Sequence, residues 1–290
     1  MIYDLTHTTA YAYASPVDLA QCVLHHQPPD RPGQRVVASV LNISPQPASM
    51  VHRLDFFGNR TAHLTFSGLH EALSIEARSR VIVEPSPAPD ATPGWTNVRS
   101  VAAMSADLGA TSPVHFLFAS RHAPLISAAR EFGLVSGCDL RAVLELATDI
   151  SNRIHDGFAY DPKATDVSTP ISQTLAKRRG VCQDFAHVMI ACLRALGLPV
   201  AYVSGYLRTY PAPGKPRLVG ADASHAWVMV WCGRETGWIG LDPTNRCLAG
   251  SDHIVLAIGR DYSDIAPVGG VFRTSGGHTL KVAVDVQEVV

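Results

Sequence analysis

The sequence predicts an α+β protein in which an antiparallel β domain precedes a core of helices packed on an antiparallel sheet. Three observations carry this prediction. Apolar and polar residues alternate with a period of two in the first part of the chain, and apolar stripes with helical spacing appear in the second part. Between them, "EPSPAPDATPGW" (84–95) has four prolines, which neither a helix nor a central strand tolerates.

The first 83 residues form the predicted β domain. In "HEALSIEARSRVIVE" (70–84) the apolar side chains from Leu73 to Val83 fall on one face and the charged ones on the other, as expected for a sheet with one wet face. "LDFFGNRTAHLTF" (54–66) places Gly58 and Asn59 between two apolar runs. Both residue types tolerate positive φ, so the pattern predicts a hairpin.

A linker at 84–97 and a core with C-terminal strands at 98–290 follow. Helices are expected at 124–133 and 139–158, the second with Asp139 as its N-cap. A further helix begins at Cys182, carries an apolar face and stops before Gly197. Strands are then expected in three runs, at 200–208, 225–232 and 238–242.

Composition limits the partners and the compartment. The 290 residues include 24 Lys+Arg against 25 Asp+Glu, which argues against binding to nucleic acid or to an anionic membrane. Asp4 and His7 interrupt the N-terminal stretch where a signal peptide needs a basic head and an apolar run, so a cytoplasmic location is expected.

The cysteines do not predict a disulfide framework or a metal site. Six of them are scattered along the chain without a CxxC pair, and a cytoplasmic protein keeps them reduced. Cys22, His25 and His26 lie close together, but a structural zinc site needs four ligands and no second pair stands at ligand spacing. We therefore expect no metal.

The last two expected strands form a hairpin that brings a histidine and a carboxylate together. A two-residue loop at 234–235 sets residue 227 opposite Asp242, so that His225 and Asp242 are diagonal neighbours on one face. A loop at 233–234 sets His225 directly opposite Asp242. Either register leaves the two side chains within hydrogen-bonding reach.

Cys182 completes a set of residues suited to nucleophilic catalysis. A thiol in the first turn of a helix faces unpaired N–H groups and the positive end of the helix dipole, which favour the thiolate. Taken singly, a lone histidine beside an apolar run or an aspartate before proline is usually structural. Together the three residues supply a nucleophile, a base and a group that orients the base.

Three segments resemble the core motifs of the transglutaminase-like superfamily, in its bacterial branch of cysteine-peptidase-like proteins. They are "GVCQDFAHVMIACLRALGLPVAYVSGYL", "DASHAWVMVW" and "GWIGLDPTN". "YDLTHTTAYAYASPV", "LDFFGNR" and "GRDYSDIAPVGGVF" resemble the flanking parts of that branch, so the likeness covers nearly the whole chain. It implies a papain-like core, with Cys182 as nucleophile, His225 as general base and acid, and Asp242 as the orienting carboxylate.

Four other residues are candidates for substrate or oxyanion contacts. Tyr160 in "FAYDP" resembles an aromatic position near the site in this family, although a tyrosine before a turn also serves packing. Gln183 and Asp184 flank the nucleophile, where helix capping is the alternative role. Trp227 shares a face with His225 and either walls the site or packs. The backbone N–H of Cys182 is a natural oxyanion donor.

The favoured hypothesis is a cysteine peptidase or amidase that hydrolyses a peptide or protein substrate through a thioester. It requires no cofactor, because the thiol supplies the covalent step. One alternative is transglutaminase-type acyl transfer from a glutamine or peptide carbonyl to an amine. The other is a non-catalytic peptide-binding protein that retains the three residues, because fold and motif alone do not give function.

Overall fold

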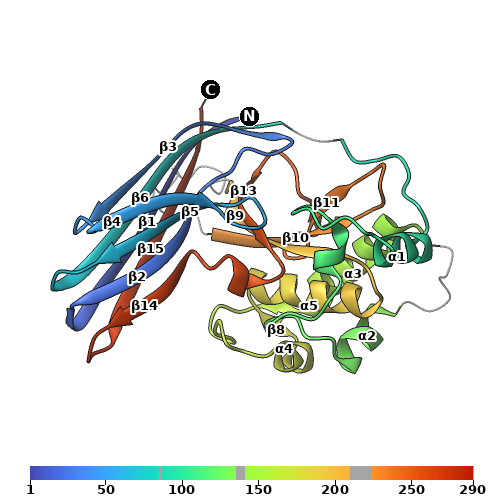
Figure 1. Ribbon diagram of the computed structural model, residues 1–290. Coiled ribbons are helices and arrows are strands. Elements are labelled where there is room, and N and C mark those ends of the chain that lie inside the picture. Colours follow the sequence, from blue (N-terminus) through green and yellow to red (C-terminus); the bar gives the residue numbers. More distant parts are fainter. Residues whose placement is uncertain (85–86, 135–140, 210–223, 290) are drawn as a thin grey trace, which may run out of the picture.

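Two antiparallel sheets packed face to face form the β domain, at the left of Figure 1. The structure is a computed structural model that describes residues 1–84, 87–134, 141–209 and 224–289. One sheet has the order β15-β1-β6-β3, formed by His278–Glu288, Ile2–Val17, His70–Val83 and Gln34–Ser44. The other has the order β14-β2-β5-β4, formed by Val268–Arg273, Leu19–Gln27, Arg60–Phe66 and Ser49–Leu54.

The alternating pattern of β6 is confirmed. Leu73 and Ile75 are fully buried against β2 and β5, whereas Glu76 and Arg78 face away from this core. The predicted hairpin around Gly58 is also confirmed, and Gly58 has a φ of 79°. The Asp55 carboxylate accepts hydrogen bonds from the N–H groups of Phe57 and Asn59 and so holds the turn.

The C-terminal strands, which the sequence analysis attached to the core, lie in the sheets of the β domain. β14 pairs with β2 and β15 pairs with β1, so the two chain ends lie close together in Figure 1. The exposed edges of β1 and β2 would otherwise present unpaired N–H and C=O groups. β15 also buries Val284 and Val286 between the β domain and the core sheet.

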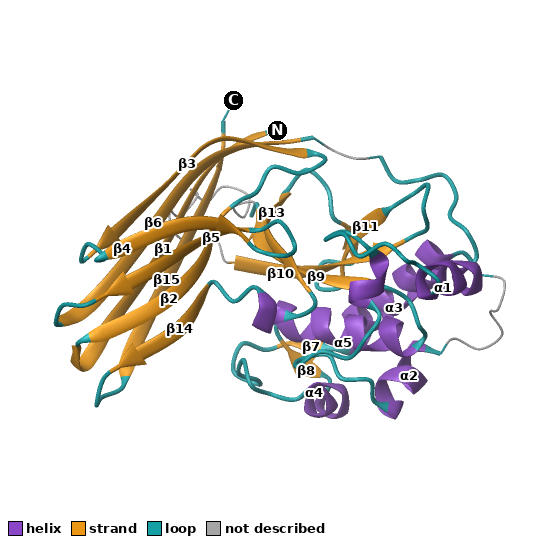
Figure 2. Cartoon of the chain, viewed as in Figure 1, coloured by secondary structure: helices purple, strands orange, loops and turns teal. Residues whose placement is uncertain are grey.

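The helices gather on one side of the molecule, as Figure 2 shows. They are α1 (Trp95–Ala103), α2 (Ser127–Gly133), α3 (Val143–Gly157), α4 (Ile171–Lys177) and α5 (Cys182–Ala195), with short 3₁₀ turns at Pro113–Phe116 and Tyr262–Asp264. α1 therefore begins inside the expected linker, of which residues 85 and 86 lie outside the described residues. The expected N-cap Asp139 also lies outside them, and α3 begins at Val143.

The core sheet has the order β12-β11-β10-β9-β13 and packs against α5. Its strands are Cys247–Leu248, Trp238–Asp242, Ser224–Trp231, Val200–Leu207 and His253–Gly259. A short parallel pair joins β7 (Ala159–Tyr160) to β8 (Arg179–Gly180). The α+β class and the helix-on-sheet core are thus confirmed, including the α5 start at Cys182 and the stop at Gly197, where φ is 82°.

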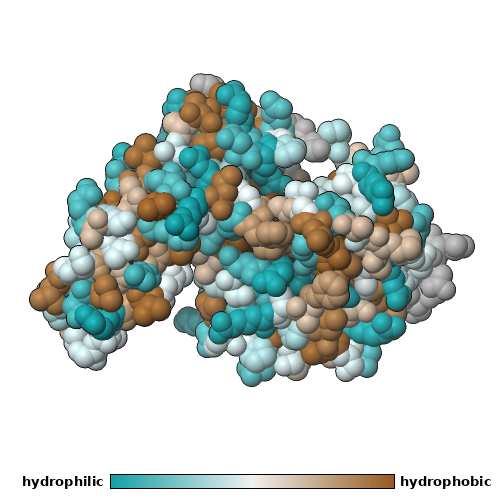
Figure 3. Space-filling view, in the orientation of Figure 1, coloured by the Kyte–Doolittle hydropathy of each residue, from teal (hydrophilic) through white to brown (hydrophobic). Residues whose placement is uncertain are grey.

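The outer surface is chemically mixed. On the face in Figure 3, apolar and hydrophilic residues are interspersed over both the β domain and the core. Within the described residues, no helix is both long enough and apolar enough to cross a bilayer.

Candidate active site

Cys182 is the first residue of α5, and the chain enters this helix in an extended conformation at Val181. The Asp184 carboxylate accepts hydrogen bonds from the Val181 N–H at 2.8 Å and from the Thr165 hydroxyl at 2.6 Å. Asp184 therefore caps the helix that presents the thiol, which is the alternative role that the sequence offers for it. Gly180 leaves room for this cap, since a Cβ there would lie 2.5 Å from Asp184 Oδ2.

The register of the β10–β11 hairpin decides where His225 and Asp242 lie. Val228 pairs with Leu241 and Trp231 with Trp238, so continuing this ladder sets Trp227 opposite Asp242. This is the first of the two expected registers, although the connecting loop is longer than two residues, because the ladder stops at Trp231–Trp238. The diagonal placement of His225 and Asp242 is confirmed: His225 Nε2 lies 2.7 Å from Asp242 Oδ2.

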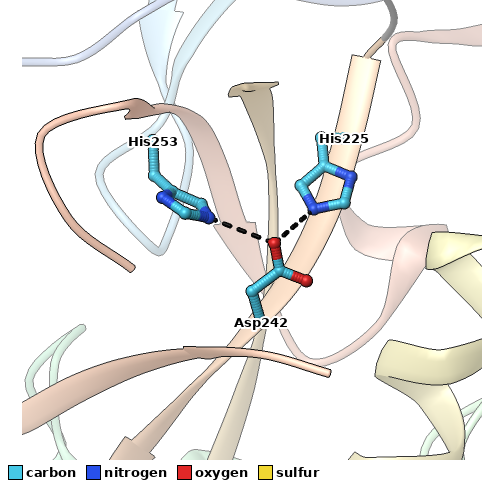
Figure 4. Close-up of side chains that lie close together, drawn as sticks. All are labelled: His225, Asp242 and His253. Carbon is cyan, nitrogen blue, oxygen red and sulfur yellow. Dashed lines mark hydrogen bonds and ion pairs between the residues drawn. The ribbon is translucent and has the colours of Figure 1, made fainter. Parts of the chain in front are cut away.

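His225 bridges Asp242 and Cys182. Figure 4 shows its Nε2 directed at Asp242 and its other ring nitrogen directed away from that carboxylate. Cys182 also acts on this imidazole, because its interaction with the ring is among those that raise the pKa of His225. Burial alone would lower the pKa of His225, but the contacts with Asp242 and Cys182 outweigh it and raise the pKa to about 9. The imidazolium form is thus favoured at neutral pH.

The Asp242 carboxylate is completely buried and fully engaged in hydrogen bonds. Its Oδ1 accepts from the N–H groups of Thr244 and Asn245, and its Oδ2 accepts from Asn245 Nδ2 at 2.7 Å as well as from His225. His253 Nε2 is the third donor to Oδ2, at 3.1 Å (Figure 4). Burial would raise the pKa of Asp242, but these donors hold it well below its usual range.

Asn245 and His253 were missed by the sequence reasoning. Asn245 follows Asp242 by three residues in "DPTN", and an asparagine in a turn after a strand gives a weak signal of this kind. His253 lies on β13, at the far edge of the sheet from β11, and nothing in the sequence near it indicates that it reaches Asp242.

His225, Asp242 and His253 form a cluster whose ligand atoms lie within 4.8 Å of one another. The hydrogen bonds test whether this cluster suits a metal ion. The Gly250 N–H donates to His253 Nδ1, at 3.2 Å. The proton of neutral His253 therefore sits on Nε2, and Nε2 has no lone pair for a metal. The arrangement fits hydrogen-bond donation to Asp242 rather than metal ligation.

The remaining candidates occupy different surroundings. Tyr160 is 57% exposed on β7, beside β8, and meets the ring of Phe185 edge-on. Burial and the charge of Cys182 both raise the pKa of Tyr160. Gln183 is half-buried in the first turn of α5. Trp227 is fully buried and packs against His225.

Most other cysteines in the described residues are buried, and burial raises the pKa of Cys192 and of Cys232 to about 12. Cys22 is buried too, and its pKa is raised to about 11 by burial. The neighbouring histidines have other partners: His25 Nδ1 bonds the Ala266 carbonyl and His26 Nε2 bonds Thr9.

Comparison with known proteins adds two family matches. Residues 3–82 match a family described as the bacterial transglutaminase-like N-terminal region, and residues 131–243 match the transglutaminase-like superfamily. An uncharacterised protein of Mycobacterium tuberculosis is 38% identical over 288 residues, which cover 98% of this chain and 92% of that protein. An uncharacterised protein of Mycobacterium leprae is 28% identical over 97% of each chain.

Two further likenesses concern better described proteins. The crystal structure of a candidate cysteine protease from Cytophaga hutchinsonii has a TM-score of 0.74 and 20% identity, covering 99% of this chain and 98% of that one, so the fold is shared. A protein-glutamine gamma-glutamyltransferase of Pseudomonas aeruginosa is 38% identical over 93 residues, which cover 31% of this chain and 14% of that protein.

Proposed function

The chain belongs to the transglutaminase-like superfamily, and on that premise we propose that it is a thiol-dependent peptide or amide hydrolase. The observation that carries the proposal is the placement of His225, whose Nε2 bonds Asp242 at 2.7 Å and whose pKa is raised by interactions with both Asp242 and Cys182. Nucleophile, base and orienting carboxylate thus stand in the order that acyl transfer to a thiol requires.

The proposed reaction has two steps. The Cys182 thiolate attacks the substrate carbonyl carbon and forms a C–S bond, while the carbonyl oxygen becomes an oxyanion that faces the helix start. His225 gives a proton to the departing amine as the C–N bond breaks, which leaves a thioester. His225 then takes a proton from water, the hydroxide attacks the thioester, and the C–S bond breaks to release the acid.

Asp242 has a supporting part in both steps. Its carboxylate stays ionised because five donors surround it. It keeps the proton of His225 on Nε2 in the neutral state and stabilises the imidazolium in the charged state. Nδ1 is thereby reserved for exchange with the thiol, the amine and water.

Alkylation with iodoacetamide as a function of pH, with mass mapping of each modified cysteine, tests the proposal. Cys182 should react faster than the other cysteines at and below pH 7, because the neighbouring His225 can accept the proton of its thiol. Cys247 is an internal control at the surface: partial burial of its thiol, together with the charges of Asp242 and Asp252, raises its pKa to about 11, so it should react only in alkaline solution. Equal reactivity of Cys182 and Cys247 at every pH would contradict the proposal.

Acyl transfer to an amine is a second candidate, favoured by the likeness of 93 residues to the gamma-glutamyltransferase. The two activities separate when a glutamine-containing peptide is incubated with a fluorescent primary amine. Release of ammonia without amine incorporation supports hydrolysis, and incorporation that outpaces hydrolysis supports transfer. A Cys182→Ala variant serves as the blank for both and should show neither reaction.

A further inference from the structure

His253 is buried beside the candidate site and makes a hydrogen bond with each ring nitrogen. Its side chain is 6% exposed. The Gly250 N–H donates to Nδ1 and Nε2 donates to Asp242 Oδ2, so the neutral tautomer is fixed by its surroundings. Trp227 meets the ring edge-on, with centroids 5.2 Å apart. His253 thus shares one carboxylate oxygen with His225.

His253 lies on β13, an edge strand of the core sheet. The β domain covers the free edge of this strand with two side-chain amides. Gln34 Nε2 donates to the Val255 carbonyl at 2.9 Å, and its Oε1 accepts from the Val255 N–H at 2.8 Å. Asn59 makes the same pair of bonds with Ile258, both at 2.7 Å. Each amide therefore takes the place of a residue on a neighbouring strand.

The two side-chain amides come from different sheets of the β domain. Gln34 begins β3, and Asn59 lies in the turn before β5, where the Asp55 carboxylate accepts from its Nδ2 at 2.7 Å. Beneath them, a buried cluster joins β1, β6 and β15 of the β domain to Ile254 and Leu256 of β13. The position of β13 is thus set jointly by the core sheet and by the β domain.

We propose that His253 is a positioning residue of the site and that the β domain, through Gln34 and Asn59, holds it against Asp242. The inference rests on the proposed function. It assigns the β domain a part in the chemistry of the core, although the three candidate catalytic residues all lie outside that domain. His253 occupies one acceptor site on Oδ2 and so limits how strongly the carboxylate binds the imidazolium of His225.

The sign of the expected effect follows from that competition. The titratable groups facing His225 are Asp242 from β11, Cys182 from α5 and His253 from β13. When the His253 donor is removed, Oδ2 is left with fewer donors, and its negative charge acts more fully on His225. Loss of the imidazolium proton should then require a higher pH.

Alkylation of Cys182 by iodoacetamide between pH 5 and 11 measures this effect without a known substrate. In the wild type the rate of alkylation should change near pH 9, where the His225 imidazolium loses its proton, and this change is called the alkaline step. His253→Leu should move this step upward by about half a pH unit or more. His253→Gln should restore it, because the glutamine amide reaches the position of Nε2 and donates from there.

The amide contacts are tested in the same assay. Gln34→Ala and Asn59→Ala should each move the step in the direction of His253→Leu, by a smaller amount. Asn42→Ala is the matched control, because Asn42 is an exposed amide of the same domain that bonds Glu76. It should leave the step unchanged. Circular dichroism at each pH confirms that the variants remain folded.

The outcomes separate this inference from the proposed function. An unchanged or lowered step in His253→Leu, or a failure of His253→Gln to restore it, overturns the inference while the low-pH reactivity of Cys182 stands. If the wild type shows no low-pH reactivity at Cys182, the proposed function fails first. If Gln34→Ala and Asn59→Ala match Asn42→Ala, the β domain does not hold His253.

Discussion

The indole of Trp227 stacks on the imidazole of His225, with ring centroids 6.0 Å apart and an interplanar angle of 25°. The two residues are two positions apart on β10 and so share a face of the sheet. The indole is fully buried over Gly205, where a Cβ would lie 2.5 Å from its Cη2. The buried indole therefore restricts rotation of the imidazole ring of His225.

Trp227→Leu should reduce both stability and the reactivity of Cys182. Removing a buried indole leaves a cavity, and we expect the free energy of unfolding to fall by about 3 kcal/mol. Urea denaturation measures this loss. Trp238→Leu is the control, because that indole is only half-buried and packs on Phe116 away from His225. A Trp227→Leu protein that loses no more stability than Trp238→Leu, and whose Cys182 is alkylated as fast as in the wild type, would contradict this prediction.

Asp242→Asn keeps the shape of the side chain and removes its charge. The raised pKa of His225 depends partly on that charge, so the alkaline step in Cys182 alkylation should move down from about 9 towards neutrality. An asparagine also favours the wrong imidazole tautomer, so hydrolysis should fall by about 10³-fold or more. An alkaline step at the wild-type pH would mean that Asp242 does not act on His225.

Much of the site could be predicted because its geometry follows from short-range rules. The period of two in a strand places His225 and Asp242 on one face in either register, and the observed ladder confirms one of them. The position of Cys182 follows from the helical pattern that begins there. The order of apolar and polar residues was likewise sufficient for β6 and for the hairpin at Gly58.

The rest depended on contacts between distant segments. His253 reaches Asp242 across the sheet, from an edge strand whose ladder with β9 is interrupted by a bulge between Val255 and Ala257. Gln34 meets Val255 across more than two hundred residues of chain. The return of β14 and β15 to the β domain is another such contact. Local periodicity does not show which edge a strand will join.

The β domain should make the protein sensitive to acid through a buried histidine. His7 is 2% exposed and bonds the Tyr206 hydroxyl, and burial lowers its pKa to about 4. A histidine that is kept neutral contributes stability above its unfolded pKa of about 6.5, and this contribution is lost as pH falls towards 4. The expected loss from this residue is about 3 kcal/mol.

His7→Gln removes that titration and keeps a hydrogen-bonding side chain. Its free energy of unfolding, measured with urea from pH 7 to pH 4, should fall less steeply with acid than that of the wild type. His52→Gln is the control, because His52 is an exposed residue of the same domain. Parallel curves for His7→Gln and the wild type would mean that His7 is not the source of the acid sensitivity.

Gly180→Ala should disturb the start of α5 without touching the three candidate catalytic residues. The added Cβ would lie 2.5 Å from Asp184 Oδ2 and 2.8 Å from Asp184 Cβ, so the capping carboxylate must move away from the Val181 N–H. Loss of a helix cap costs about 1 to 2 kcal/mol, and the displaced first turn carries Cys182 with it. We therefore expect a lower midpoint in urea and slower alkylation of Cys182 near pH 6. Gly68→Ala is the matched control, because a Cβ there meets nothing within 4 Å. If both variants alkylate like the wild type, the Asp184 cap does not set the position of the thiol.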